Sequence, residues 1–239
     1  VPPDLRIEPD LSVAGHRDRI VRHCLGERLQ GGIVMHGGFF LGPHAFYESL
    51  RGMDHRERQK FSMTSVMLVN QLYGHQRLAT LQRTAARFFN TTMMVTLGGA
   101  ACSDGLEDGR VVSGVGGQYN FVAMAHELPG ARSILMLRST RTQKGRTTSN
   151  ILARYGHTTI PRHLRDVVIT EYCIADLRGR TDREVVAALL KIADSRFQEG
   201  LMRSAKTSGK LPRDFRIPAA FRSNLPERLA DQLAGAKRK

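Results

Sequence analysis

A glycine-rich turn is the first segment of this 239-residue chain whose residue types suit ligand binding. It follows a short expected strand and precedes a helical pattern over residues 121–128. N–H groups at the start of a helix bind phosphate and other anions, because the helix dipole is positive there. The dinucleotide fingerprint is absent, since Tyr119 stands where it requires glycine. A tight structural turn is the other interpretation of the segment, which runs Ser113, Gly114, Val115, Gly116, Gly117, Gln118.

A second segment with suitable chemistry is basic and spans residues 138–150. It comes directly after an expected strand over residues 133–137, and ligands of open α/β sheets bind beyond the carboxyl ends of strands. Hydroxyl side chains between the charges favour phosphate binding, although a solvated surface loop fits the composition equally well. The four basic residues are Arg138, Arg141, Lys144 and Arg146.

Glu171 is the third candidate, because it follows an apolar strand expected over residues 166–170. A carboxylate in this position suits a hydrogen-bonded, orienting role in a site. A carboxylate that only caps the strand end is the alternative. The residues alone favour neither strongly.

No metal site is predicted from spacing. The cysteines Cys24, Cys102 and Cys173 are each separated by more than seventy residues, which argues against a disulfide scaffold, a CxxC centre or a cysteine-based zinc site. The nine histidines have no HxxxH spacing. This cysteine usage favours a reducing, cytoplasmic location. The most apolar stretch, residues 93–102, is about half the roughly 20 residues that a membrane-spanning helix needs, so no membrane segment is expected.

Short apolar strands alternate with helical patterns along the chain, which predicts an α/β fold with an open, mostly parallel sheet and helices on both faces. The domain boundaries expected from composition are a polar, partly helical lead-in over 1–30, the α/β domain over 31–197, and a basic extension over 198–239. Strands are expected over 33–35, 62–68, 91–97, 133–137 and 166–170, and helices over 18–29, 43–53, 79–89, 121–128 and from Thr181 or Asp182 to 197.

The formal net charge of +14 indicates a polyanionic partner. Residues 196–239 hold 11 Lys or Arg against 4 Asp or Glu, so half of the excess lies in the last part of the chain. Nucleic acid, a membrane surface and a ligand with several phosphates are the candidates. Aromatic residues make up 6% of the chain, there is no Trp, and no RNA-binding motif occurs, which leaves a nucleic-acid-binding or interaction module as the weaker alternative.

Three segments together resemble the C-terminal domain of the acetyl-CoA hydrolase/transferase family, which belongs to the family I CoA-transferases. They are SGVGGQYNF at 113–121, the segment 139–151, and TEYCIADLRG at 170–179, in the order found in the family. An FLGP turn at 40–43 also fits, and the resemblance covers about residues 31–197. It implies a NagB/RpiA/CoA-transferase-like fold, an acyl-CoA ligand, and a small carboxylate or water as acceptor.

The resemblance also implies roles for single residues. Glu171 corresponds to an orienting catalytic carboxylate, and Asn90 to a polar donor near the reacting carbonyl. A backbone N–H of Gly116 or Gly117 corresponds to a donor that holds the acyl oxygen. The implied CoA- and acyl-binding set is Gly114, Val115, Gly116, Gly117, Gln118, Ser139, Thr140, Arg141, Lys144, Gly145 and Arg146.

The chain departs from the family pattern at the nucleophile. Family members use a glutamate, followed by Asp-Gly, that forms a glutamyl-CoA thioester. Neither Glu8 nor Glu27 has these flanking residues, so the nucleophile is expected in an N-terminal half of a longer protein, and this chain is expected to be inactive alone. Cys173 replaces a usual glycine and Asn120 a usual aspartate. A homo-oligomer is the expected assembly, and a non-catalytic family member is the other alternative.

Overall fold

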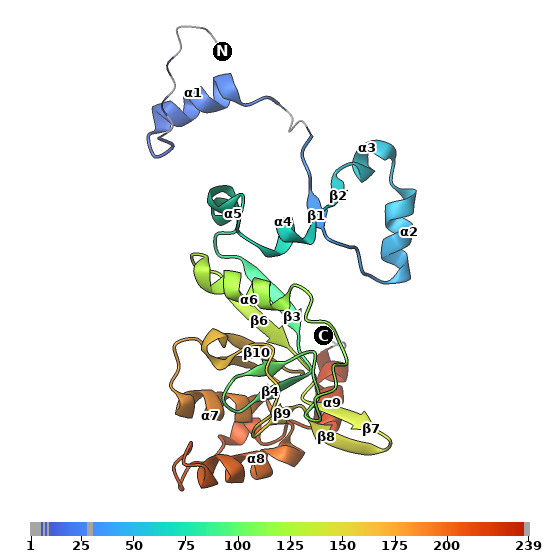
Figure 1. Ribbon diagram of the computed structural model, residues 1–239, viewed down its shortest axis with the longest axis vertical. Helices are drawn as coiled ribbons and strands as arrows, with labels where there is room; N and C mark the ends of the chain where they lie inside the picture. Colours follow the sequence, from blue (N-terminus) through green and yellow to red (C-terminus); the bar gives the residue numbers. More distant parts are fainter. Residues whose placement is uncertain (1–5, 7, 9, 28–30, 237–239) are drawn as a thin grey trace. The chain divides into compact units, whose positions relative to one another are not determined.

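A computed structural model describes Arg6, Glu8, residues 10–27 and residues 31–236 (Figure 1). The chain forms two compact units, Val1–Val69 and Asn70–Lys239. In the first unit, β1 and β2 pair in parallel, with Met35 opposite Phe61. Its elements are α1 (Ala14–Cys24), β1 (Met35–Gly37), α2 (His44–Gly52), α3 (His55–Arg58), β2 (Phe61–Met63) and α4 (Val66–Asn70), which crosses the boundary.

Two sequence predictions for this unit are confirmed and one is partly wrong. The helix over 43–53 forms as α2, and the helix over 18–29 forms earlier, as α1, while residues 28–30 lie outside the described residues. The strand over 62–68 stops at Met63. There the Ser65 hydroxyl accepts a hydrogen bond from the Met67 N–H at 3.3 Å, which satisfies a free donor of the first turn and favours a helix start.

The second unit is built on a four-stranded sheet. It contains β3 (Arg87–Thr91), β6 (Arg132–Met136), β10 (Val167–Ile169) and β11 (Ile174–Asp176), in the order β11-β10-β6-β3. β3, β6 and β10 are parallel, β11 is antiparallel to β10, and Figure 1 shows β6 between its two parallel neighbours. The predicted α/β class with a mostly parallel sheet is therefore confirmed.

The remaining elements of this unit surround that sheet. A smaller sheet has the order β5-β4-β9, and β7 and β8 form a hairpin that projects from the body of the unit (Figure 1). All helices in the described part of the chain are too short or too polar to cross a lipid bilayer. The bounds are α5 (Gln76–Gln82), β4 (Met94–Thr96), β5 (Ala101–Cys102), α6 (Gln118–Glu127), β7 (Thr140–Gln143), β8 (Arg146–Ser149), β9 (Ile151–Leu152), α7 (Asp182–Ile192), α8 (Ser195–Thr207) and α9 (Pro226–Ala236), with 3-10 turns at Arg162–Leu164 and Ala219–Phe221.

The two faces of the four-stranded sheet differ in their cover. Leu135 and Val168 are paired across β6 and β10, and both belong to one core cluster with residues of α6 and α7. Side chains alternate along a strand, so Phe89 and Ile174 point to the opposite face, where they are 59% and 62% exposed. Helices on both faces were expected; within residues 70–236, α6 and α7 both pack on the same face.

The C-terminal part of the chain joins this core. Thr181 caps α7 in a capping box with Glu184, as one of the two predicted cap positions required. The helix ends at Ile192, and α8 begins two residues beyond the following Ala193. The structure differs from the expected boundary at 198, because α8 crosses it and later apolar side chains are buried with the main core. These are Leu201, Ala205, Leu211 and Ile217.

Asp194 links the end of α7 to α8 and to the segment after β10. Its side chain is fully buried, accepts a hydrogen bond from the Tyr172 hydroxyl at 2.9 Å, and forms a salt bridge with Arg196 at 2.7 Å. Burial alone would raise the pKa of Asp194, but the hydrogen bonds from Arg196 and Tyr172 outweigh it and lower the pKa below its ordinary value of 3.8. Burial, followed by the Asp194 carboxylate, raises the pKa of Tyr172.

We expect replacement of Asp194 by Asn to remove a pH-dependent part of the stability. Because the pKa of Asp194 is lower in the folded chain than in the unfolded chain, its contribution is present above about pH 3.8 and is lost as the pH falls further. Urea unfolding between pH 6 and pH 2.5 should therefore show a difference between wild type and Asp194→Asn that narrows below pH 3.8. Asp231→Asn on the exposed side of α9 is the control, and a pH-independent difference for Asp194→Asn would contradict the assignment.

Candidate functional site

The three parallel strands end at the same edge of the sheet, and the residues that follow them line a pocket. β3 ends at Thr91, β6 at Met136 and β10 at Ile169. The pocket beyond these ends is open on one side and has a volume of about 690 Å³, which lies within the range of small-molecule sites. Its lining residues are Thr92, Met93, Arg138, Thr140, Arg141, Thr142, Asn150 and Glu171.

Glu171 is held in place by a single neighbour, Ser139. The Ser139 backbone N–H donates to Oε2 of Glu171 at 2.8 Å, and the Ser139 hydroxyl donates to Oε1 at 2.6 Å. Ser139 itself is fully buried, whereas Glu171 is exposed toward the pocket. Both carboxylate oxygens are thus oriented by groups from the neighbouring strand end, and their remaining lone pairs are available to a ligand.

The basic segment forms a hairpin instead of the loop considered from sequence. Gln143 pairs with Arg146, and the two residues between them, Lys144 and Gly145, have φ of 49° and 74°. Two positive φ values in a two-residue connection are typical of a type I′ turn, which matches the twist of the strands. Arg141 lies near the base of the hairpin, with its Nη1 3.3 Å from the Met94 sulfur, and it lines the pocket. Lys144, Gly145 and Arg146 occupy the tip.

Two asparagines near the pocket, Asn150, which is buried, and Asn90, which is half-buried, each have a buried side-chain atom without a partner within the described residues. The amide of Asn150 donates to the Arg138 carbonyl at 2.9 Å, and its Oδ1 is unpartnered. Asn90 lies on β3, two residues before the pocket-lining Thr92, and its Nδ2 is unpartnered. An unsatisfied buried polar group costs about 1–3 kcal/mol, so these atoms favour a bound polar group as their missing partner.

The glycine-rich turn leads into α6 at the end of β3. Gly117 is the N-cap residue of α6, and the Gln118 side chain donates to the Thr91 carbonyl at 2.8 Å, which fixes the helix start beside the strand end. A side chain added at Gly114 or Gly116 would meet nothing within 4 Å. The backbone of the turn is therefore open to close approach by a ligand, and the positive end of the helix dipole lies behind it.

Residues 42–205 match the C-terminal domain of the acetyl-CoA hydrolase/transferase family. This chain belongs to that family. It is 36% identical over 121 residues to the 4-hydroxybutyrate coenzyme A transferase of Clostridium kluyveri, a match that covers 49% of this chain and 27% of that protein. A probable butyrate:acetyl-CoA coenzyme A-transferase of Syntrophomonas wolfei is 36% identical over 120 residues, with 49% and 27% covered.

A solved structure has a similar fold. A single-residue variant of RipA, a protein known from Yersinia pestis, superposes with a TM-score of 0.60 at 27% identity. The superposition covers 73% of this chain and 37% of that chain. The CoA-transferase-like fold expected from the sequence is confirmed. This family member spans about a quarter of the length of the curated relatives that it matches.

In this acetyl-CoA hydrolase/transferase chain, the predicted site residues are only partly brought together. Ser139, Thr140, Arg141 and Glu171 line or underlie the pocket, and Asn90 and Gln118 lie near its edge on β3 and α6. The hairpin tip is separate from the pocket lining. Thr92 and Met93 were not predicted as site residues, because the expected strand over 91–97 included both, whereas β3 ends at Thr91 and leaves them just beyond the strand.

Proposed function

We propose that this chain binds the CoA portion of an acyl-CoA and supplies part of the active site for CoA transfer to a small carboxylate, or for transfer of the acyl group to water. The observation that carries the proposal is the Glu171 carboxylate, fixed by two hydrogen bonds from Ser139 in a pocket that also contains Arg138 and Arg141. The names of the curated relatives, which are CoA-transferases, support the same reaction class.

The charges around the pocket suit the phosphates of CoA. The ligand carries a diphosphate and a 3′-phosphate, and cationic side chains bind such groups through charge-assisted hydrogen bonds. Arg138 and Arg141 stand at the pocket, while Lys144 and Arg146 extend along the hairpin. We assign the phosphates to this hairpin, because the neutral, hydrogen-bonding end of the ligand then lies toward Glu171.

The reacting thioester would lie between Glu171, Asn90 and the start of α6. The N–H of Gly116, where the space beside the backbone is open, and the N–H of Gly117 supply donors for the acyl oxygen, whose negative charge increases in the transition state. The unpartnered Nδ2 of Asn90 is a further donor for the same carbonyl. Glu171 then orients the reacting groups, and its negative charge keeps the acceptor carboxylate from binding in its place.

The covalent step that we propose needs a second carboxylate. A glutamate attacks the thioester carbonyl and releases CoA thiolate, and this thiolate then attacks the resulting anhydride, so that the acyl group leaves as a carboxylate and a glutamyl-CoA thioester remains. The acceptor carboxylate then attacks the glutamyl-CoA thioester and releases CoA thiolate, which attacks the acceptor carbonyl of the new anhydride, so that a new acyl-CoA leaves and the glutamate is restored; water instead cleaves the glutamyl-CoA thioester to glutamate and free CoA. We assign this nucleophile to an N-terminal half of a longer protein, because neither Glu8 nor Glu27 has the flanking residues of the family pattern, and we expect a homo-oligomeric enzyme.

Calorimetric titration tests the binding proposal directly. The full chain is titrated at physiological salt with CoA and acetyl-CoA, and with inorganic triphosphate and a short DNA duplex as charge controls. Saturable CoA binding that exceeds binding of both controls supports the proposal. DNA bound at least as tightly as CoA would favour the nucleic-acid-binding alternative and overturn it.

A second prediction concerns the hairpin. Replacing Arg141, Lys144 and Arg146 together by Gln should weaken CoA binding by about tenfold or more, because charge-assisted contacts to phosphate are lost. Dephospho-CoA should lose less, since it has no 3′-phosphate to lose contact with. Calorimetry measures both ligands. The matched control replaces the exposed residues Arg203, Lys210 and Arg213, which changes the net charge equally; equal losses for CoA and dephospho-CoA, or equal losses in both triple variants, would contradict the assignment.

A further inference from the structure

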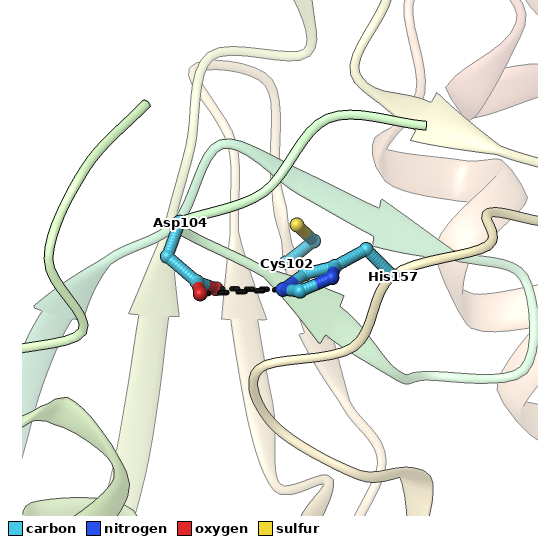
Figure 2. A group of neighbouring side chains, drawn as sticks. All are labelled: Cys102, Asp104 and His157. Carbon is cyan, nitrogen blue, oxygen red and sulfur yellow. Dashed lines mark hydrogen bonds and ion pairs between the residues drawn. The ribbon is translucent and has the colours of Figure 1, made fainter. Parts of the chain in front are cut away.

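Three side chains with metal-binding atoms meet on the smaller sheet of the second unit, away from the pocket lining. Cys102 ends β5, Asp104 follows it by two residues, and His157 comes from the segment after β9. Their ligand atoms all lie within 4.8 Å of one another. Figure 2 shows the carboxylate of Asp104 and the ring of His157 facing each other, with Cys102 beside them. Because Asp104 and His157 are 53 positions apart in the chain, their spacing did not indicate the cluster.

The surrounding backbone holds the three groups in these positions. The Thr159 hydroxyl donates to Oδ1 of Asp104, and the Ser103 N–H donates to that hydroxyl at 2.8 Å, which fixes the carboxylate from behind. The His157 ring lies directly against Gly105. A Cβ at that glycine would stand 2.6–2.7 Å from three ring atoms, so a residue with a side chain could not occupy position 105 without moving the imidazole.

The separation of His157 from Asp104 agrees with the ligand shell of a small divalent cation. Nε2 of His157 lies 3.2 Å from Oδ2 of Asp104. Zinc binds nitrogen and oxygen at about 2.0–2.1 Å, so two ligands at the corners of a tetrahedron lie about 3.3 Å apart. Cysteine, histidine and aspartate together suit zinc and similar borderline cations. The side chain of His157 is 38% exposed, which leaves room for water as a fourth ligand.

The same three residue types also form nucleophilic triads, but this geometry does not suit one. A thiol nucleophile must be accessible and must face the imidazole that activates it. Cys102 is 2% exposed, and its sulfur contacts the Gly105 carbonyl at 3.0 Å. The imidazole nitrogen Nε2 faces the carboxylate of Asp104. The arrangement therefore favours shared coordination over attack on a substrate.

We propose that Cys102, Asp104 and His157 form a binding site for one zinc-like divalent cation, with water as its fourth ligand. The cation ties together two segments that position the pocket. The Asp104 carbonyl accepts hydrogen bonds from the N–H groups of Val112 and Ser113, at the entry to the glycine-rich turn. The Cys102 carbonyl accepts from the Thr92 hydroxyl at 2.9 Å and from the Met93 N–H at 3.0 Å, and both residues line the pocket.

Cobalt titration of the full chain tests this site. Chelator-treated protein carrying Cys24→Ser, which removes an exposed thiol, is titrated with Co²⁺ and then with Zn²⁺. We expect one equivalent of Co²⁺, a sulfur-to-cobalt charge-transfer band in the near ultraviolet, displacement by Zn²⁺, and a rise in the melting temperature. Cys102→Ser should remove the charge-transfer band, and His157→Ala should weaken Co²⁺ binding by at least tenfold.

Matched substitutions separate this site from chance binding. Cys173→Ser and His163→Ala remove the same residue types elsewhere and should leave the band and the stoichiometry unchanged. Circular dichroism checks that His157→Ala folds, and Asp104→Asn provides a second variant of nearly unchanged size. Three results would each overturn the proposal. They are binding of less than one equivalent of Co²⁺, a spectrum without the sulfur band, and a Co²⁺ affinity that is unchanged in both His157→Ala and Asp104→Asn. None of these outcomes depends on CoA binding.

Discussion

Replacing Glu171 by alanine should lower the rate of CoA transfer by more than tenfold. Glu171 is the carboxylate among the residues that line the pocket, and both of its oxygens are oriented by Ser139. Its loss removes an oriented charge from the position where we place the reacting thioester, which weakens transition-state stabilisation more than ground-state binding. The measurement is the initial rate of transfer from acetyl-CoA to a small carboxylate, in the catalytically active form of the protein.

Two further variants show which property of Glu171 the reaction needs and supply a control. Glu171→Gln keeps an oxygen that can accept from Ser139 but removes the charge, so a comparison with Glu171→Ala separates charge from hydrogen bonding. Glu107→Ala, on an exposed loop of the same unit, is the control and should retain full activity. If kcat and the pH profile of Glu171→Ala both equal those of wild type, Glu171 has no part in the mechanism.

The largest effect on stability is expected at Asp166, which lies just before β10. Its side chain is 1% exposed and forms salt bridges with Arg132 at 2.7 Å and with Arg178 at 2.5 Å. It also accepts a hydrogen bond from the Ser133 N–H at 2.7 Å. Asp166→Ala would leave Arg178 without its carboxylate partner, whereas Arg132 would keep its salt bridge to Asp176 at 2.6 Å. Such a loss typically lowers the unfolding free energy by about 3–5 kcal/mol, measurable by urea denaturation.

Asp182 supplies the matched comparison for that experiment. It also contacts two arginines, Arg162 at 2.8 Å and Arg165 at 2.9 Å, but its side chain is 52% exposed. Water already solvates this carboxylate, so Asp182→Ala should lower the unfolding free energy by about 1 kcal/mol or less. Similar losses for the two variants would show that burial of Asp166 contributes little.

The parts of the structure that the sequence predicted well depend on local signals. β6, β10 and the N-terminus of α7 follow from short apolar runs and from the Thr181–Glu184 capping box, all of which act within a few residues. Glu171 was located by the same reasoning, because it directly follows a strand. The class of fold then followed from the alternation of these elements.

The predictions that were wrong depend on contacts between distant residues. The helix expected over 79–89 ends at Gln82, and its last residues, 87–89, belong instead to β3, which pairs with β6. Phe88 is drawn into the strand by stacking on Phe121, 33 residues further along the chain, with ring centroids 5.8 Å apart. Tertiary packing overrides local propensity in such a segment. The metal-ligand cluster escaped prediction for the same reason, since Cys102 and His157 meet only after folding.

The parallel pairing of β3 with β6 also affects synthesis of the chain. Forty residues lie between Thr91, the last residue of β3, and Arg132, the first residue of β6. At a translation rate of roughly 5–20 residues per second, β3 is synthesised about 2–8 s before its partner strand begins. During that interval Phe88 and Phe89 have no sheet to join. Until β6 has emerged, residues 87–91 are therefore an unpaired apolar segment that is open to association with other chains.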